Sequence, residues 1–521
     1  MSMHPIQLTR PRTGRAQIED VAVWLHARDQ VAIAREPLAP GLVLETPSGL
    51  FTVHQLVPAG HKVAVENVAC GEPIRRYGQV IGFATTSISP GEHVHSHNLG
   101  LARLQHEYAF AVDAQPVDYV SDDQHRTYLG YRRADGRVGT RNYLAVISSV
   151  NCSASVARYV ANRFSGDVQR EFPHVDGVLA LTHKGGCGAH YGGSEVDLLQ
   201  RTLAGFARHP NIAGYVLVGL GCEINQIPDM VQAQHLGEPT SLVIQDEGGL
   251  VETVEAGVRA VRGLLPAADQ CRRQSAPASK LVVALQCGGS DAWSGITANP
   301  ALGRAVDLLV AQGGAALLAE TPEVYGAEHL LTRRAVSEQV GRKLLDRIAW
   351  WERYTAMNGA EINNNPTPGN KLGGLTSIFE KSLGAVAKSG TTPMVDVLQY
   401  AEPVSTHGFI HMDSPGYDPV SITGQVASGC NLVVFTTGRG SVFGCKPVPT
   451  IKVASNTPMY RRMQGDMDIN AGRVLEGETL DTMGREIFET MLRVASGEQT
   501  KSESHGIGEE EFNPWILGAT L

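Results

Sequence analysis

The sequence contains no apolar run long enough to cross a membrane. A membrane helix needs about 18 or more largely apolar residues in a row, whereas the longest uncharged stretch, residues 419–438, is rich in Ser, Thr, Gly, Gln and Asn. The N-terminus carries Arg10, Arg12 and Arg15 before its first acid, Glu19, but lacks the apolar segment of a secretory signal. We therefore expect a soluble, cytoplasmic protein with no membrane partner.

Cysteine is also scarce, and the motifs of nucleotide-binding proteins are missing. Eight cysteines in 521 residues, without a CxxC pair, are too few to cross-link the chain, so we expect free thiols in a reducing compartment. No GxxxxGK[ST] loop occurs, and no GxGxxG opens a helix after the first apolar strand. The 44 basic and 53 acidic residues give a net charge of −9 and are interspersed, which argues against a nucleic-acid partner.

Length and hydrophobic patterning predict several domains. A chain of 521 residues is too long for one compact core. Short β-type runs within residues 24–96, broken by Gly and Pro, predict a small all-β module. From Tyr131 onward, continuous apolar runs alternate with amphipathic stretches, the pattern of parallel strands covered by helices. The expected fold class is therefore α/β, with an N-terminal all-β module and a larger body of two Rossmann-like parts with mostly parallel sheets.

The same patterning gives expected boundaries. They are a flexible arm, or alternatively a transit peptide, at residues 1–20, the β module at 21–103, a linker at 104–127, and two α/β domains at 128–275 and 276–521.

Four of the eight cysteines follow apolar strands. Cys152 comes after VISSV, Cys187 after GVLALTH and a glycine turn, Cys222 after GYVLVGLG, and Cys287 after LVVALQ. Because ligands of doubly wound sheets collect at the carboxyl ends of the strands, we expect these thiols to meet at one site with Glu223. Thiolate and imidazole are soft ligands that suit iron or zinc. The alternative is that each cysteine is an inert packing residue.

Histidines alternate in the segment GEHVHSHN at residues 91–98. On an extended strand, His93, His95 and His97 would point to one face, because side chains alternate with a period of two. Two or three imidazoles could then reach one metal ion or anion. The alternative is a solvated polar turn. His61 stands alone after Pro-Ala-Gly, where a turn histidine is an equally good interpretation.

Two further segments offer groups that could hold a carboxylate. The sequence NPTPGNK ends in Asn370 and Lys371, which the prolines would fix in place as hydrogen-bond donors. The sequence FTTGRG presents Thr437 and Arg439 after an apolar strand, a setting for bidentate carboxylate binding. A rigid interdomain turn and a solvated loop are the respective alternatives.

With these residues in place, the chain resembles the altronate dehydratase and galactarate dehydratase family over nearly its whole length. The N-terminal module is similar to the SAF domain, a small β-clip, of these enzymes. The histidine segment resembles the altronate branch, and so do Pro322, Glu323 and residues 326–328. Residues 184–187 and 444–446 depart from the family pattern. The matching segments are residues 60–62, 76–78, 131–133 with Gly139, 219–223, 286–291 with Gly295, 298–300, 366–371, 388–390 and 436–440.

The resemblance implies a hydro-lyase that removes water from an aldonate such as D-altronate and forms a 2-keto-3-deoxy acid. It also implies ferrous iron or another divalent ion such as Mn²⁺, because removal of a proton next to a carboxylate builds up negative charge that a cation stabilises. The expected catalytic residues are His61, His93, His95, His97 and Lys371. The expected substrate-binding residues are Ser290, Asp291, Asn299, Asn370, Lys371, Thr437 and Arg439. The expected metal ligands are Cys152, Cys187, Cys222, Glu223, Cys287, His93 and His95.

Several alternatives stay open at this point. The substrate could be galactarate or another aldarate, or a sulfo-acid that loses sulfite instead of water. Three of the four strand-end cysteines could hold an iron–sulfur cluster in place of a single ion. A sugar-acid or metal-binding protein without catalysis is a further alternative. In every case the expected partner is a small molecule, and a site assembled from the β module and the α/β body could use two subunits of a homo-oligomer.

Overall fold

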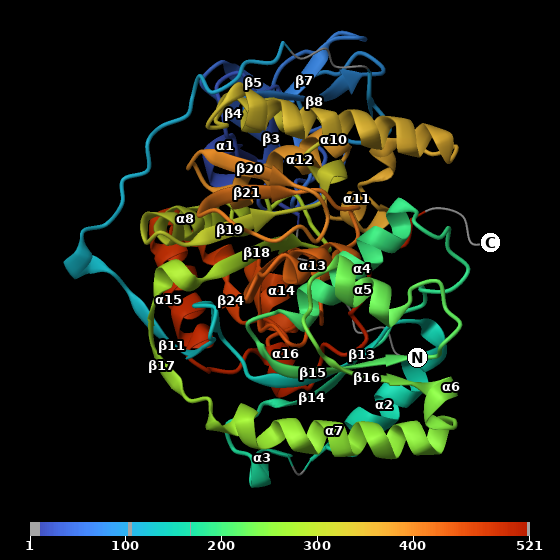
Figure 1. Cartoon of the computed structure of the whole chain (residues 1–521). Helices are drawn as coiled ribbons and strands as arrows, with labels where there is room; N and C mark the ends of the chain where they lie inside the picture. The colour runs from blue at the N-terminus through green and yellow to red at the C-terminus, as the bar shows by residue number, and fades with distance from the viewer. Residues whose placement is uncertain (1–10, 103–106, 167, 518–521) are drawn as a thin grey trace, which may run out of the picture.

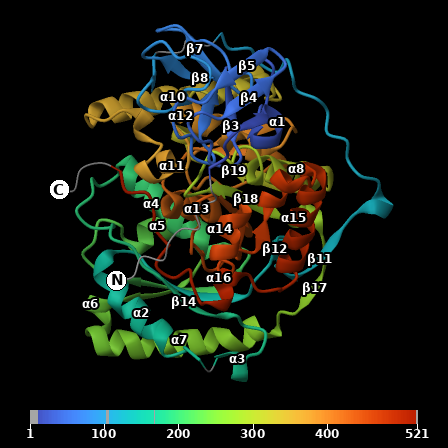
Figure 2. The same ribbon diagram turned by 180° about the vertical axis from the view of Figure 1, so that it is seen from behind.

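The computed structural model describes residues 11–102, 107–166 and 168–517, and it contains a β module and two α/β domains (Figure 1). The β module lies at one end of the molecule beside α10 (Glu338–Met357) and α12 (Ile378–Val386), and α7 (Leu250–Gln270) lies at the opposite end (Figures 1 and 2). The expected fold class is confirmed. Among the described residues, no helix combines the length and apolarity that a membrane crossing requires.

The β module consists of short strands in three small sheets, ordered β1-β4-β5, β2-β3-β6-β9 and β10-β8-β7. Glycine turns with positive φ at Gly41, Gly60, Gly71 and Gly91 keep these strands short. The bounds are β1 Arg15–Gln17, α1 Ile18–Val21, β2 Ala22–Val23, β3 Val31–Ala34, β4 Val43–Thr46, β5 Gly49–Thr52, β6 Lys62–Ala64, β7 Pro73–Arg76, β8 Gln79–Ala84, β9 His93–Val94 and β10 Leu99–Gly100.

The expected N-terminal arm is partly a packed element. Residues 1–10, with Arg10, lie outside the described residues. β1 pairs in parallel with β4, and the carbonyl of Pro37 accepts a hydrogen bond from the backbone N–H of Arg12. The segment from residue 11 to 20 therefore belongs to the β module and is not a free arm.

The first α/β domain has a fully parallel sheet in the order β14-β13-β15-β16. Its apolar strands are covered by helices on both faces, as their continuous apolar runs predict. The bounds are β13 Tyr143–Ser148, η2 Asn151–Ser153, α2 Ala154–Asn162, α3 Val168–Glu171, β14 Gly177–Leu181, α4 Ser194–Ala207, β15 Ile212–Gly219, α5 Ile227–Ala233, β16 Thr240–Val243 and α6 Ile244–Glu247. An antiparallel sheet of β12 (Val138–Gly139), β11 (Thr127–Arg132) and β17 (Arg273–Pro277) joins the two ends of this domain to the second one.

The second α/β domain is built on seven parallel strands in the order β20-β21-β19-β18-β22-β23-β24. From β18 the chain passes to β19 on one side, and from β22 it passes to β23 on the other side. The carboxyl ends of β18 and β22 thus form a topological switch point, where ligands of open α/β sheets bind. The strand bounds are β18 Val282–Cys287, β19 Ala315–Leu318, β20 Met394–Leu398, β21 Gly408–Met412, β22 Leu432–Thr437, β23 Thr450–Ala454 and β24 Ile469–Asn470. The other helices of the domain are α8 Ala298–Ala311, α9 Glu328–Arg333, α11 Pro368–Leu372, α13 Asp418–Ala427, α14 Thr457–Arg462, α15 Leu480–Ala495 and α16 Lys501–Ser504.

A buried ion-pair group fixes the β module on the second α/β domain. The Lys62 ammonium lies 2.9 Å from both carboxylate oxygens of Glu380, and the Arg76 guanidinium lies 2.6 Å from one of them. All three side chains are buried. Because β6 and β7 supply the cations and α12 supplies the carboxylate, the orientation of the module on the body is specified by charge as well as by the shared apolar core.

Candidate functional site

Four histidines of the β module gather where it meets the second α/β domain. His61 directly precedes β6, and His93 begins β9, which pairs with β6. The ring centroid of His61 lies 5.1 Å from that of His93 and 5.0 Å from that of His95. The His93 centroid lies 5.4 Å from those of both His95 and His97. The expected gathering of the three alternating histidines is present, and His61 joins it.

The expected reason for this gathering is wrong, because the strand ends at Val94. Residues 95–98 form a turn in which the backbone N–H groups of Asn98 and Leu99 donate to the His95 carbonyl, at 3.0 and 2.9 Å. The Asn98 side chain accepts from the His95 N–H at 2.9 Å and donates to the His93 carbonyl at 3.0 Å. The turn, rather than the alternation of a strand, brings these imidazoles together.

Backbone carbonyls of α11 fix two of the rings. His95 Nε2 lies 3.0 Å from the Lys371 carbonyl oxygen, and His61 Nε2 lies 3.3 Å from that of Leu372. Since a carbonyl only accepts, both Nε2 atoms carry a proton, and His61 Nδ1 accepts from His93 Nε2 at 3.0 Å. This tautomer assignment leaves the Nδ1 atoms of His93 and His95 as unprotonated nitrogens.

The environment keeps these imidazoles uncharged near neutral pH. Burial is the main cause that lowers the pKa of His61 to about 4, against the opposing effect of its bond to Leu372. Burial, followed by the neighbouring imidazoles, lowers the pKa of His93 to about 3. Burial also lowers the pKa of His95. Neutral imidazole is the form that binds a divalent cation. The unprotonated Nδ1 atoms of His93 and of His95, the latter 3.1 Å from the Ser96 hydroxyl, are donors of the kind that a divalent ion takes, although with His97 they do not bring three ligand atoms within 4.8 Å of one another.

α11 carries Asn370 and Lys371 to this cluster, but only one of the two side chains has a free polar group. The Asn370 oxygen accepts from the Thr367 N–H at 3.0 Å in a capping box, and its amide donates to the Ser290 carbonyl at 2.8 Å. Asn370 thus positions α11 against the end of β18. Lys371 is half-buried next to the histidines, where an ammonium could hold a carboxylate.

The residues expected to bind substrate converge on the switch point below α11. Ser290 and Asp291 follow β18, Thr437 ends β22, and the backbone N–H of Arg439 donates to the Gly289 carbonyl at 2.8 Å. Among the described residues, the buried Ser290 hydroxyl has no hydrogen-bond partner. Arg439 is exposed. Ser290 and Arg439 can therefore face a ligand at this switch point, and the buried Thr437 hydroxyl, which accepts from the Gly440 N–H at 3.0 Å, keeps its proton for donation.

Asp291 and Asn299 instead hold the protein together. The Asp291 carboxylate accepts from the Ser455 hydroxyl at 2.8 Å and from the Asn456 amide at 3.0 Å. The Asn299 oxygen accepts from the Thr436 hydroxyl at 2.6 Å, and its amide donates to the Gly384 carbonyl at 2.8 Å. These side chains are positioning residues of the switch point rather than free substrate ligands.

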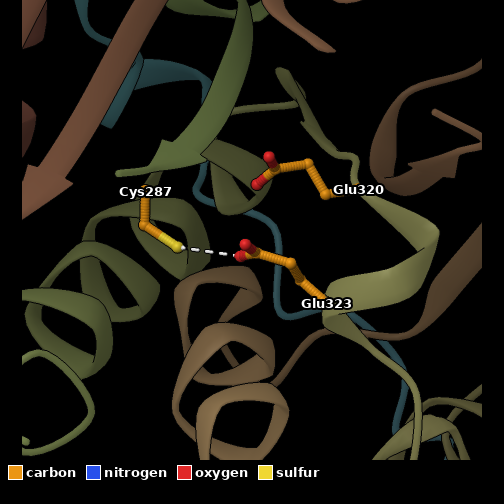
Figure 3. Close-up of side chains that lie close together, drawn as sticks. All are labelled: Cys287, Glu320 and Glu323. Atoms are coloured by element: carbon orange, nitrogen blue, oxygen red, sulfur yellow. Dashed lines mark hydrogen bonds between the residues drawn. The ribbon is translucent and has the colours of Figure 1, made fainter. Parts of the chain in front are cut away.

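Cys287 lies at the same strand end, in a buried group of charged side chains. Its Sγ atom lies 3.4 Å from a Glu323 oxygen and 2.9 Å from the Lys388 ammonium. Figure 3 shows the thiol and the carboxylates of Glu320 and Glu323 turned toward one another. Among the residues that the structure describes, these three are the group of Cys, His, Asp or Glu whose ligand atoms all lie within 4.8 Å.

The charges of this group balance without a metal ion. Burial, with the charges of Glu323 and Asp418, raises the pKa of Glu320 well above its usual value. Burial raises the pKa of the Cys287 thiol to about 12. Glu323 stays ionised because Lys381, 2.5 Å away, and Lys388 lower its pKa despite its burial. Two ammonium groups thus face the carboxylates of Glu323 and Asp418, so the donor set does not fit a resident divalent cation.

A small cavity of about 10 Å³ connects the Cys287 group to the switch point. Its lining includes Cys287, Lys381, Ser290 and Asn299. This volume is enough for about one water molecule. The buried charges therefore lie directly behind the switch point.

The remaining expected metal ligands lie on the other parallel sheet. Cys152 follows β13, Cys187 follows β14, and Cys222 and Glu223 follow β15, all in the first α/β domain. These three thiols are exposed, whereas Cys287 is buried. The expectation that four strand-end cysteines share one site with the histidines is wrong, because they belong to two separate sheets.

Glu223 is also not available as a ligand. One of its oxygens accepts from the Ser149 hydroxyl at 2.8 Å, and the other accepts from the Gly221 N–H at 2.6 Å. The carboxylate therefore shapes the turn after β15.

Sequence analysis missed the buried charged residues behind the switch point. Neither Glu320 nor Lys381 was expected at the site, and Glu323 and Lys388 were noted only as residues that match the family. The signal that could have found them is position: Glu320 and Glu323 follow the apolar strand β19 directly, as the cysteines follow theirs. Glu320 also adopts a left-handed conformation with φ of 69°, which is uncommon for a residue other than glycine.

Comparisons with known proteins cover the chain from the β module to its C-terminal part. The family model for the altronate/galactarate dehydratase SAF domain matches residues 20–102. The model for the second domain of D-galactarate dehydratase/altronate hydrolase matches residues 130–269. The model for the C-terminal part of D-galactarate/altronate dehydratase matches residues 278–520.

Individual relatives agree with these matches. The chain is 36% identical to altronate dehydratase of Bacillus subtilis (strain 168) over 96% of its own length and 99% of that protein. It is 39% identical to galactarate dehydratase (L-threo-forming) of Escherichia coli (strain K12) over 94% of its length and 96% of that protein. It is also 34% identical to the (2R)-sulfolactate sulfo-lyase subunit beta of Chromohalobacter salexigens over 74% of its length and 96% of that subunit.

Proposed function

Because the chain belongs to the D-galactarate/altronate dehydratase family, we propose that it is a hydro-lyase that removes water from a sugar acid at the switch point beneath the histidine cluster. The observation that carries this proposal is the cluster of four imidazoles, two of which are held by carbonyls of α11, while Asn370 of the same helix is bonded to the Ser290 carbonyl after β18. This arrangement brings proton-transfer groups and carboxylate-binding groups to one crevice.

The substrate carboxylate would bind to cationic side chains at the rim of the crevice. Lys371 stands at the histidine side and Arg439 at the β22 side, and each can donate to a carboxylate oxygen. The Ser290 and Thr437 hydroxyls can bond to sugar hydroxyls. These contacts would fix the acid with its C2 and C3 atoms below the imidazoles.

An imidazole would then take the proton from C2. The unprotonated Nδ1 of His93 is suited to this role, because its neighbours already fix its tautomer and burial keeps it neutral. The C2–H bond and the C3–O bond break, a C2=C3 bond forms, and the departing hydroxyl takes up a proton and leaves as water. The resulting enol tautomerises to the 2-keto-3-deoxy acid.

Removal of the C2 proton places a second negative charge next to the carboxylate. A divalent ion such as Fe²⁺ or Mn²⁺, when bound by His95 and His97 and not by the His93 nitrogen that takes the proton, would supply the positive charge that lowers this barrier. The protein's own contributions are to hold the imidazoles neutral, to orient the carboxylate and to exclude water with the β module.

We propose an aldonate such as D-altronate as the first substrate to test, with galactarate as the second. A panel of aldonates and aldarates, assayed with Fe²⁺ for 2-keto acid formation, tests this choice. Turnover of an aldonate supports the proposal. If every acid of the panel binds and none reacts, the chain is a binding protein and the hydro-lyase proposal fails.

A sulfo-acid lyase is a second candidate, because one relative that matches 74% of the chain is named a sulfolactate sulfo-lyase subunit. The same proton abstraction would expel sulfite from C3 in place of hydroxide. Adding (2R)-sulfolactate to the panel and measuring sulfite separates the two reactions.

The proposal also includes a cytoplasmic location, a small sugar acid as the binding partner, and no nucleic acid or membrane partner. Fractionation of cells that produce the protein tests the location. Light scattering of the purified protein tests whether the site is completed in a homo-oligomer.

A further inference from the structure

Three exposed cysteines of the first α/β domain follow neighbouring strands of one sheet. Cys152 lies in η2 directly after β13, Cys187 lies six residues beyond the end of β14, and Cys222 lies three residues beyond the end of β15. β13 is the centre of this trio, since it pairs with both β14 and β15 in parallel. The three loops therefore leave the sheet at the same edge.

Backbone and side-chain hydrogen bonds tie these loops together around Gly186. The Asn151 N–H donates to the Gly185 carbonyl, and the Asn225 N–H donates to the Gly186 carbonyl, both at 3.0 Å. The Asn225 amide also donates to the Ser149 carbonyl at 2.8 Å. Each cysteine is within three residues of one of these bonds, so the three loops that carry the thiols are tied together. The Cys222 Sγ atom also accepts a hydrogen bond from the Gln245 amide at 3.6 Å.

Close packing at Gly186 requires a glycine at the point where these loops meet. A Cβ atom at Gly186 would lie 2.5 Å from the Ser149 carbonyl oxygen, so no larger residue fits between the loops. Gly186, Gly188 and Gly221 have φ values of +93°, +68° and +127°. Left-handed residues within such turns let successive N–H groups face one side, as in the backbone concavities that surround iron–sulfur sites.

We propose that Cys152, Cys187 and Cys222 hold an iron–sulfur cluster, a second metal centre separate from the histidine cluster. A single tetrahedral ion would need sulfur atoms about 3.8 Å apart, given a metal–sulfur distance of about 2.3 Å. Among the described residues, only Cys287 with Glu320 and Glu323 brings three ligand atoms within 4.8 Å. The three thiols are not all within 4.8 Å of one another, which excludes a single tetrahedral ion in this arrangement, and thiolates are the ligands of polynuclear iron–sulfur clusters.

Three thiolates leave one iron of a four-iron cluster without a cysteine ligand. Cys287 does not supply the fourth, because it is buried on the other sheet against Lys388. Because the trio is exposed, the open position can bind a solvent or substrate oxygen. Assembly of a four-iron cluster in its 2+ state takes up two ferrous ions, two ferric ions and four sulfide ions, and it releases one proton from each cysteine thiol. This inference does not depend on the proposed sugar-acid reaction.

The test uses the full chain, purified without oxygen and reconstituted with iron and sulfide. We expect acid-labile sulfide in step with iron and a broad visible absorption band. Both should fall to background in C152S, C187S and C222S. Matched controls are C70S, an exposed cysteine in the β module, and C287S, which should both keep the cluster. Thermal melting checks that each variant is folded.

Iron without sulfide in the wild type would overturn the cluster assignment, and so would full retention of sulfide in any of the three trio variants. Loss of the cluster in folded C287S would contradict the choice of ligands. The variant H93N separates this inference from the proposed function: it should lose dehydratase activity while keeping the cluster.

Discussion

The Nδ1 atom of His61 lies 3.0 Å from the Nε2 atom of His93, although the two residues are on different loops of the β module. Because a carbonyl of α11 already fixes the proton on His61 Nε2, this contact leaves His93 Nδ1 unprotonated. The α/β body therefore determines which nitrogen of His93 carries the proton, although its own hydrogen bond is to His61. The chemistry of the β module depends on how it is docked.

Replacement of His93 by Asn should remove this nitrogen with little change in packing. We expect kcat for the best substrate to fall by about 10²- to 10⁴-fold, as for the loss of a general base. Steady-state kinetics with Fe²⁺ present would measure the effect. His54→Asn is a matched control, because His54 is an exposed histidine of the same module. A fall of similar size in the control, or none in His93→Asn, would remove His93 from the reaction.

The rate at which each cysteine reacts with a thiol reagent should depend on how deeply it is buried. In the reduced, metal-free protein we expect four to react rapidly with a thiol reagent: the exposed Cys70, Cys152, Cys187 and Cys222. Cys287 and Cys445 should react slowly, because burial raises their pKa values to about 12 and blocks access. Time-resolved labelling with mass spectrometry assigns each site. Rapid modification of Cys287 in the folded protein would contradict its placement.

The strands were predictable because their apolar runs are continuous, and the strand-end cysteines could be located for the same reason. What the sequence could not show is which strands share a sheet. Cys222 and Cys287 look equivalent in the sequence, yet one ends a strand of the four-stranded sheet and the other a strand of the seven-stranded sheet. Pairing between distant strands depends on tertiary packing, which the periodicity of a single strand does not encode.

The histidine cluster was predicted from alternation but arises from a turn, and His61 was expected at the site from the family resemblance and not from its spacing. The buried ion pairs were missed altogether. Lys62 lies in a short apolar run and Glu380 lies on a helix, and neither spacing indicates a partner more than 300 residues away. Such ion pairs can be identified only when the position of the β module on the α/β body is known.

Replacement of Glu380 by Gln should strongly destabilise the protein. The change leaves the ammonium of Lys62 and the guanidinium of Arg76 buried without a counter-charge, and losing one partner of a buried pair costs about 3–5 kcal/mol. Urea denaturation measures the change in the free energy of unfolding. The control Glu338→Gln removes an exposed pair with Arg342 and should cost under about 1 kcal/mol.

A second variant tests the cause of that loss. If the unpaired charges are responsible, the double variant Lys62→Met with Glu380→Gln should be more stable than Glu380→Gln alone, because one uncompensated cation is gone. A double variant that is less stable than the single one would instead assign the loss to packing.

The contribution of Glu380 should also depend on pH in a defined window. Burial would raise the pKa of this carboxyl, but the charges of Lys62 and Arg76 outweigh it and lower the pKa from 4.5 to about 2. As the pH falls below 4.5, the unfolded chain takes up a proton at this position before the folded one does, so stability is lost. The stability that Glu380 contributes is thus complete above pH 4.5 and disappears as the pH approaches 2.

Urea midpoints of the wild type and Glu380→Gln between pH 7 and pH 3 should differ by a constant amount down to about pH 5 and converge below it. A difference that stays constant down to pH 3 would mean that the carboxyl has an ordinary pKa in the folded protein, and that the ion-pair group does not hold the module by charge.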